Sequence, residues 1–246
     1  MPVEAADVWT PPENPDPNAI LHDAVADTRA GRYETSLAKH VWYHENALKI
    51  GPGQYGVRLS FALMYWMDLA EAYPPAMDKL KAVRDEAGRK VLAESGKTAH
   101  DFFHDFVAIN RELEESNRVL ALFQQLHMTD PEKAKDVYGL AEPVLIRAKE
   151  YKLCGEYLDR DAAIPLIIRG YQVNRRLESR YGDEHKQFVE RKMTNESATL
   201  VALLAVNGRN EEAQKAAEEL KQAWDEQAFH KAIETALTGK VPEPWP

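Results

Sequence analysis

Cysteine is almost absent from this sequence, which contains only Cys154 among its 246 residues. A disulfide needs two cysteines, and multi-cysteine zinc or iron–sulfur sites need several. The composition therefore excludes both kinds of site. It is typical of a protein in a reducing compartment, so we expect a cytoplasmic protein that carries no cofactor.

Long apolar runs and an excess of positive charge are also missing. The longest apolar stretches, residues 61–67 and 198–206, are much shorter than the ~20 residues that span a bilayer. Residues 1–17 lack the basic segment followed by an apolar one that marks a secretory signal. The 31 Lys and Arg face 40 Asp and Glu, and the net charge of −9 repels a nucleic-acid backbone. We therefore expect neither a membrane nor a nucleic acid as partner.

Proline is rare in the middle of the chain and frequent at its ends. Five of the fourteen prolines lie in residues 1–17 and three in the last five residues. Because proline breaks helices, the sequence predicts an extended tail over 1–17, a single helical domain over 18–240 and a Pro/Trp tail over 241–246. The last tail, with Trp245 among its prolines, either extends freely, docks back on the domain or engages a partner.

Between the ends, apolar residues recur three and four positions apart, and strict alternation is missing. This period predicts an all-α protein. The predicted helices cover residues 18–30, 33–49, 56–72, 75–94, 98–113, 115–128, 131–149 with a break near Pro143, 151–158, 163–181, 184–207, 210–224 and 226–238. The short connections between them make consecutive helices antiparallel, so we expect stacked helix pairs that form a right-handed α–α superhelix.

One spacing recurs along the chain with varying fidelity: a turn residue, an aromatic residue two positions later, and a small residue three positions further. Its four copies begin at Gly31, Thr129, Lys149 and Gly208. The small residues are Ser36, Ala134, Cys154 and Ala213, and we interpret Cys154 as a packing residue because no nucleophile signature accompanies it.

These copies, as in Gly31-Arg32-Tyr33-Glu34-Thr35-Ser36, resemble the tetratricopeptide-repeat family. Residues 40–63, 103–110 and 151–158 are similar to a bacterial group of such proteins for which no activity is assigned. The turn positions are 98, 20 and 59 residues apart and depart from the family period of ~34 residues. The resemblance implies a degenerate helical solenoid that holds a peptide or partner protein in its concave face.

Two helical segments each carry histidines four positions apart, His40 with His44 and His100 with His104. Positions i and i+4 share one helix face, so each pair has the spacing to reach one metal ion. Glu45, Asp101 and Asp105 are the nearest carboxylates in the sequence. The alternative is that all four histidines are hydrogen-bonded packing residues, since neither pair has the glutamate of a metalloprotease signature.

Aromatic residues are crowded in the first third of the chain, where residues 33–73 hold eight of the 22. Tyr and Trp suit both a tightly packed core and a groove that binds a peptide. We predict a ligand-binding surface formed by Arg58, Tyr65, Trp66 and Trp42, with Arg58 as a clamp for a carboxylate.

The sequence thus favours a non-catalytic scaffold that binds a protein or peptide. A metal-binding protein or metalloenzyme based on the histidine pairs is the first alternative. A structural component of an oligomer, with the aromatic region as subunit interface, is the second.

Overall fold

A computed structural model describes residues 9–245, and residues 178 and 179 by their backbone alone. Within 9–245 the chain forms thirteen α-helices and one 3-10 turn and has no β-strand, which confirms the all-α prediction. Of the predicted tails, residues 1–8 and residue 246 lie outside the described residues. No described helix combines the length and hydrophobicity needed to cross a bilayer.

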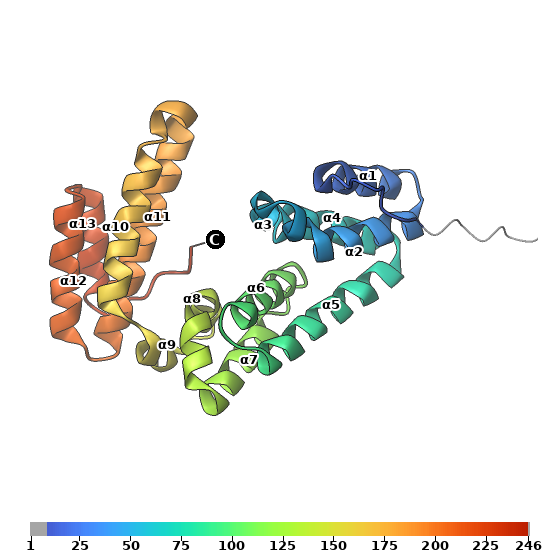
Figure 1. The fold of residues 1–246 in the computed structure, drawn as a ribbon. Helices are drawn as coiled ribbons and strands as arrows, with labels where there is room; N and C mark the ends of the chain where they lie inside the picture. Colours follow the sequence, from blue (N-terminus) through green and yellow to red (C-terminus); the bar gives the residue numbers. More distant parts are fainter. Residues whose placement is uncertain (1–8, 246) are drawn as a thin grey trace, which may run out of the picture. The chain divides into compact units, whose positions relative to one another are not determined.

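The chain groups into two compact units, Met1–Lys133 and Ala134–Pro246, which are described separately. The first contains α1 (Pro17–Arg29), α2 (Tyr33–Ile50), η1 (Pro52–Gln54), α3 (Tyr55–Arg58), α4 (Phe61–Ala72), α5 (Pro74–Ala93), α6 (Gly96–Glu112) and α7 (Ser116–Thr129). Helix α8 (Pro131–Arg147) starts at the boundary, and the second unit continues with α9 (Tyr151–Tyr157), α10 (Arg160–Arg175), α11 (Glu178–Val206), α12 (Asn210–Ala223) and α13 (Gln227–Ala236) (Figure 1).

The observed helices differ from the predicted ones at three places. The predicted helix 56–72 is interrupted at Leu59 and Ser60, whereas α8 continues through Pro143, so the break predicted there is wrong. Helix α10 starts and ends earlier than predicted. Helix α11 starts at Glu178, before the predicted start at residue 184, and holds a non-helical residue at Gly182, with φ 76°. Elsewhere the predicted ends agree within two residues.

Four helix ends share one turn geometry. Gly31, Glu114, Lys149 and Gly208 all adopt the left-handed conformation, with φ between 56° and 76°. In each turn the next residue's N–H donates to the carbonyl oxygen five positions back, for example Arg32 to Asp27 at 2.9 Å. This pattern closes a helix and satisfies its last carbonyl groups. Thr129, a predicted turn position, does not adopt this conformation.

The small residues of the recurring pattern are all interior: Ser36, Ala134, Cys154 and Ala213 are at most 1% exposed. A small side chain lets two helix backbones approach closely without a void. The Ser36 hydroxyl also donates to the Ala24 carbonyl oxygen at 2.8 Å, which joins α2 to α1.

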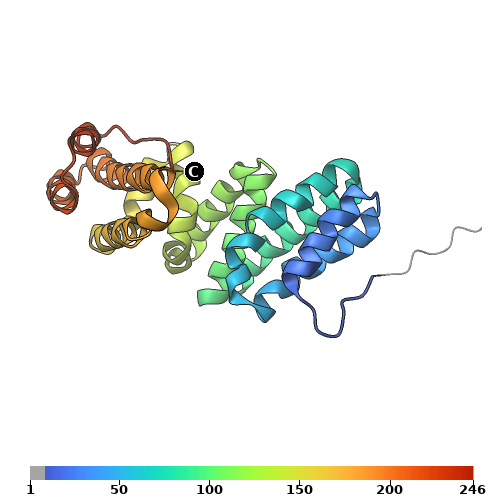
Figure 2. The same ribbon diagram turned by 90° about the horizontal axis from the view of Figure 1, so that it is seen from above.

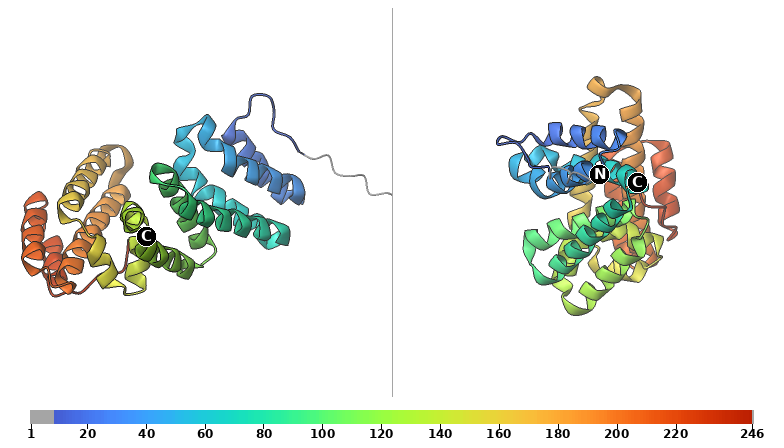
Figure 3. Two further views of the ribbon diagram at one scale, coloured as in Figure 1. Left: turned by 60° about the horizontal axis from the view of Figure 1, so that its bottom comes forward. Right: turned by 90° about the vertical axis from the view of Figure 1, so that its right-hand side faces the viewer.

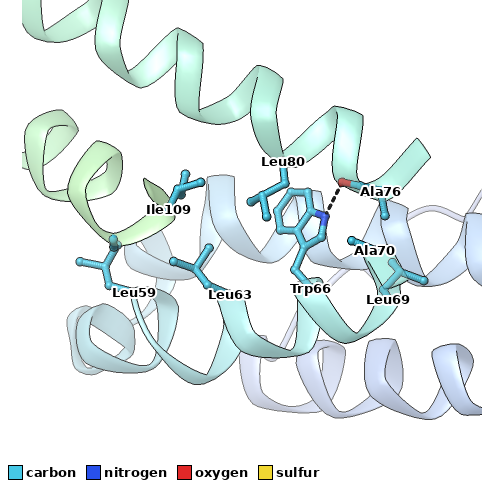
Figure 4. Packing of buried hydrophobic residues seen from close by; sticks show 9 residues of the cluster. Leu59, Leu63, Trp66, Leu69, Ala70, Ala76, Leu80 and Ile109 are labelled. Carbon is cyan, nitrogen blue, oxygen red and sulfur yellow. Dashed lines mark hydrogen bonds between the residues drawn. The ribbon is translucent and has the colours of Figure 1, made fainter. Parts of the chain in front are cut away.

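In the first unit, successive helices pack side by side, α1 on α2, α2 on α4, α4 on α5 and α5 on α6 (Figure 2). Their apolar faces meet in a core that contains Leu63, Trp66, Leu69, Leu80 and Ile109. Figure 4 shows Trp66 reaching from α4 to α5, where its indole N–H donates to the Ala76 carbonyl oxygen at 3.1 Å.

In the second unit, α11 is the central helix, because it packs against α9, α10, α12 and α13 (Figure 3). Its residues 198 and 200–204 are buried, together with Leu220 of α12 and Ile233 of α13. A helix with neighbours on several sides needs apolar residues around most of its circumference. This explains the apolar stretch 198–206 of the sequence.

Candidate functional site

The first unit contains a buried ion pair between Arg58, at the end of α3, and Asp105 of α6. The Arg58 guanidinium donates to both carboxylate oxygens of Asp105, with 2.7 Å between Nη2 and Oδ2. Its Nε donates to the His44 carbonyl oxygen at 2.7 Å, and Nη2 lies 3.1 Å from Nε2 of His44. All three side chains are buried. The hydrogen bonds compensate for removing both charges from water.

Both histidines of α2 contact Trp66, and His44 is also part of this network. The ring of His40 stacks on Trp66 at 5.8 Å, and the ring of His44 meets it edge-on at 6.2 Å. The His40 Nε2 atom is buried without a hydrogen-bond partner. Burial lowers the pKa of both histidines to about 4. Both rings are therefore neutral at physiological pH.

The histidines of α6 have separate surroundings. His104 Nδ1 lies 2.7 Å from the hydroxyl of Tyr55, whereas His100 is more exposed and lies beside Asp101, 3.8 Å away. Of the predicted carboxylates, Glu45 is exposed. No group of three or more His, Cys, Asp or Glu within residues 9–245 has the arrangement to hold a metal ion. The geometry therefore lends the metal hypothesis no support.

The predicted ligand-binding residues are divided between interior and surface. Arg58 and Trp66 are 8% and 1% exposed, and their polar atoms are already hydrogen-bonded inside the unit. The carboxylate that Arg58 clamps thus belongs to Asp105. Trp42 meets Trp9 edge-on at 6.3 Å. Tyr65 lines a cavity of about 540 Å³ with Val57 and the exposed Phe61.

In the second unit, the C-terminal tail lies along α11. Gly239 lies near Val206 at the end of this helix, where a Cβ atom added to the glycine would be 3.7 Å from Cβ of Val206. Asn195 donates from Nδ2 to the Glu243 carbonyl oxygen at 2.8 Å, and Trp245 packs edge-on against Phe188 at 5.5 Å. The contacts move back along α11 as the tail proceeds, so the two segments are antiparallel (Figure 1). Of the possibilities left by the sequence, docking on the helical domain is the one observed.

One side of the tail faces a cavity of about 790 Å³, which we call the α13 cavity. Its walls come from α11, α13 and the tail, and include Ala198, Trp224, Phe229, Pro242 and Trp245. Trp224 stacks between Tyr171 at 5.1 Å and Phe229 at 4.8 Å, which fixes the orientation of its ring. The result is a concave, mostly apolar surface of the size that holds a ligand segment.

The other side of the tail faces a second cavity of about 740 Å³, the α8 cavity, between α8, α10 and α11. Trp245 and Asn195 line both cavities, so the two cavities adjoin where the tail crosses α11, and we call them together the depression along α11. The apolar wall of the α8 cavity includes the stacked rings of Tyr138 and Tyr157, 5.9 Å apart, and Leu200. Its polar residues include Glu142, Glu196 and Thr199.

Three titratable groups cluster at the wall of the α8 cavity. The Tyr138 hydroxyl donates to Glu142 at 2.6 Å. Burial, followed by the nearby Glu196 carboxylate, raises the pKa of Glu142, although the bond from Tyr138 opposes this. Behind them lies Cys154, whose thiol pKa burial raises to about 12. A thiol with this pKa is protonated at neutral pH and is a poor nucleophile, which agrees with a packing role.

Little in the sequence indicates the α13 and α8 cavities. The only signal was Trp245 among its prolines, an aromatic residue in a segment that cannot continue a helix. The cavity walls themselves come from residues that are far apart in the sequence.

Comparison of the chain with protein-family models, with curated proteins and with solved structures finds no match.

Proposed function

We propose that this chain is a non-catalytic scaffold that binds an extended peptide segment of a partner protein in the depression along α11. The observation that carries the proposal is the seat of the chain's own tail, an extended segment rich in proline and tryptophan. A surface that holds such a segment in cis has the shape and chemistry to hold a similar one in trans.

The aromatic walls support this proposal on energetic grounds. Trp224 and Phe229 line the α13 cavity, and Tyr138 and Tyr157 line the α8 cavity. Aromatic side chains provide large contact areas at low entropic cost and dominate many peptide interfaces. A proline-rich ligand is already extended, so it loses little conformational entropy on binding.

Within this proposal, the helix pairs form a degenerate solenoid similar to tetratricopeptide repeats. The left-handed turns at Gly31, Lys149 and Gly208 and the buried small residue that follows each of them support this view. The sequence predicted peptide binding around Arg58 and Trp66 in the first unit. Because both side chains are buried there, we propose the second unit as the binding site instead.

A labelled peptide with the sequence of residues 239–246 tests the proposal. In the full-length chain the tail competes with it, and a short tether gives an effective concentration of about 1 mM. If the free peptide binds with a Kd of about 100 μM, the tail occupies the site ~90% of the time. Trp245→Ala weakens this competitor, so we expect the labelled peptide to bind up to about tenfold more tightly.

Trp9→Ala is the matched control, because it removes a tryptophan that packs on Trp42 in the first unit. This variant should bind the peptide as the wild type does. Fluorescence anisotropy that reveals no saturable binding to Trp245→Ala up to millimolar protein would refute the proposed function.

A further inference from the structure

The α8 cavity contains a carboxylate that lacks a positively charged partner. Glu142 accepts a hydrogen bond from Tyr138, but no lysine, arginine or histidine within residues 9–245 forms an ion pair with it. The neighbouring Glu196 is paired with Lys192, one turn earlier on α11, at 2.5 Å. An unpaired carboxylate in a partly buried position is costly, because burial disfavours its charge.

Thr199 is an independent sign of an incomplete site. It lies one turn beyond Glu196 and Asn195 on the face of α11 that lines the α8 cavity. Its side chain is only 6% exposed, and its Oγ1 atom has no hydrogen-bond partner. Buried hydroxyl groups in folded proteins are normally hydrogen-bonded. The wall of the cavity therefore contains a carboxylate without a cation and, just beneath the surface, a hydroxyl without a hydrogen-bond partner.

The walls of the same cavity are apolar. Leu200, Ile167 and the exposed Leu166 line it together with Tyr138 and Tyr157. Such a wall suits the methylene chain of a lysine or arginine, while the aromatic rings favour a nearby cation. Three carboxylates, Glu142, Asp159 and Glu196, line the cavity against two lysines. Because Lys192 is already paired with Glu196, the lining favours a cation over an acidic side chain or a phosphate.

Resting on the proposed function, we propose that the α8 cavity binds the basic side chain, lysine or arginine, of the incoming peptide. The tail indicates the position of this residue. Pro244 lines the α8 cavity, whereas Pro242 lines the α13 cavity. The basic residue of the peptide therefore takes the place of Pro244, immediately before the tryptophan that packs on Phe188. The ammonium or guanidinium group donates to Glu142 and to the hydroxyl of Thr199.

Two peptides test this assignment. Both have the sequence of residues 239–246, with lysine in one and glutamine in the other at the position of Pro244. In the full-length Trp245→Ala protein, we expect the lysine peptide to bind about tenfold more tightly, as expected for a charged pair formed away from solvent. In the double variant Trp245→Ala, Glu142→Gln the two peptides should bind equally, since glutamine keeps the acceptor for Tyr138 and removes the charge.

Glu184→Gln, added to Trp245→Ala, is the control for the loss of one negative charge, because Glu184 is exposed on α11 and does not line the cavity. It should retain the preference for lysine. Thr199→Val, which removes only the hydroxyl, should reduce the preference about threefold. Circular dichroism and thermal unfolding of each variant establish that the fold is intact.

The outcomes separate the two proposals. Equal affinity of both peptides for Trp245→Ala overturns the assignment of the basic residue and leaves peptide binding in place. A lysine preference that survives Glu142→Gln also overturns it, because the charge then lies elsewhere. Failure of both peptides to bind refutes the proposed function and this inference together.

Discussion

At the scale of single residues, the first unit is organised around a buried charge. Arg58 and Asp105 are each less than a tenth exposed and form two hydrogen bonds with each other. Such a pair adds little net stability relative to apolar residues, but removal of one partner leaves a buried charge without compensation. The role of the ion pair is therefore to fix the orientation of α3 relative to α6.

The variant Asp105→Asn should therefore lower the free energy of unfolding by about 3–5 kcal/mol, measured by urea denaturation at pH 7. Glu86→Gln is the control, because it disrupts a surface pair with Arg89, and should cost less than ~0.5 kcal/mol. A loss below ~1 kcal/mol for Asp105→Asn would contradict the structural role of the ion pair.

The buried histidines predict acid sensitivity. Burial lowers the pKa of His40 and His44 to about 4, whereas in the unfolded chain each has a pKa of about 6.5. The unfolded state thus binds more protons between pH 6.5 and 4. Each neutral, buried histidine therefore contributes fully to the free energy of unfolding above pH 6.5. Between pH 6.5 and pH 4 this contribution falls by ~1.4 kcal/mol per pH unit.

Urea denaturation at pH 7 and pH 5 measures the effect. His40→Leu removes one of the two groups and should reduce the loss of stability over this interval by on the order of 2 kcal/mol. His22→Gln changes an exposed histidine and should leave the loss unchanged. The same pH dependence in wild type and His40→Leu would show that this ring is not buried in its neutral form.

Gly155 marks a close approach between α9 and the end of α11. A Cβ atom at this position would lie 2.4 Å from Cγ of Asn207, whose amide donates to the Tyr151 carbonyl oxygen at 2.8 Å. Gly155→Ala should therefore destabilise the protein by about 1–3 kcal/mol through overpacking. Gly139→Ala, in a helix with open space around the added methyl group, should be neutral or stabilising by up to ~1 kcal/mol. Thermal unfolding that ranks the two variants in the opposite order would contradict this packing.

The sequence identified some of these residues but not their roles. The spacing of His40 and His44 indicated one helix face, and packing was one of its two interpretations. The pairing of Arg58 with Asp105, 47 positions apart, leaves no local signal. Burial of Trp66 depends on which of its neighbours α4 meets, which a single sequence does not determine.

At the scale of helices, the period of apolar residues and the turn glycines predicted most helix ends. The break at Leu59 and Ser60 lacks a proline or a glycine and is fixed by distant contacts. Arg111 donates to the Leu59 carbonyl oxygen at 2.8 Å, and the preceding Arg58 is held by Asp105. Such contacts replace the hydrogen bonds of a continuous helix, and they are invisible to helix propensity.

Helix α8 shows the converse case, in which a proline fails to end a helix. Pro143 has no N–H for the carbonyl oxygen of Gly139, and both residues line the α8 cavity, where that carbonyl is not enclosed by another helix. Pro143→Ala restores the donor and should stabilise the protein by about 1–2 kcal/mol, after allowance for the greater freedom of the unfolded chain. Urea denaturation that reveals a less stable variant would show that the packing of α8 depends on the proline ring at this position.

Across the whole chain, the two units differ in where their distinctive side chains lie. The first has a sealed interior in which the chemically distinctive side chains bind one another. The second has a depression along α11 that is occupied by a segment of the same chain. The all-helical composition could be predicted from the sequence, whereas this division could not. Arg58 and Trp66 are buried, and the aromatic residues that line the depression come from segments far apart in the sequence.

Hydrogen–deuterium exchange of full-length Trp245→Ala, with and without the peptide of residues 239–246, tests the central claim most directly. If the peptide binds along α11, added peptide should slow exchange in α11 and α13 and leave exchange in α1–α7 unchanged. Slower exchange confined to α2 and α4, around the predicted surface of Tyr65 and Trp42, would contradict it.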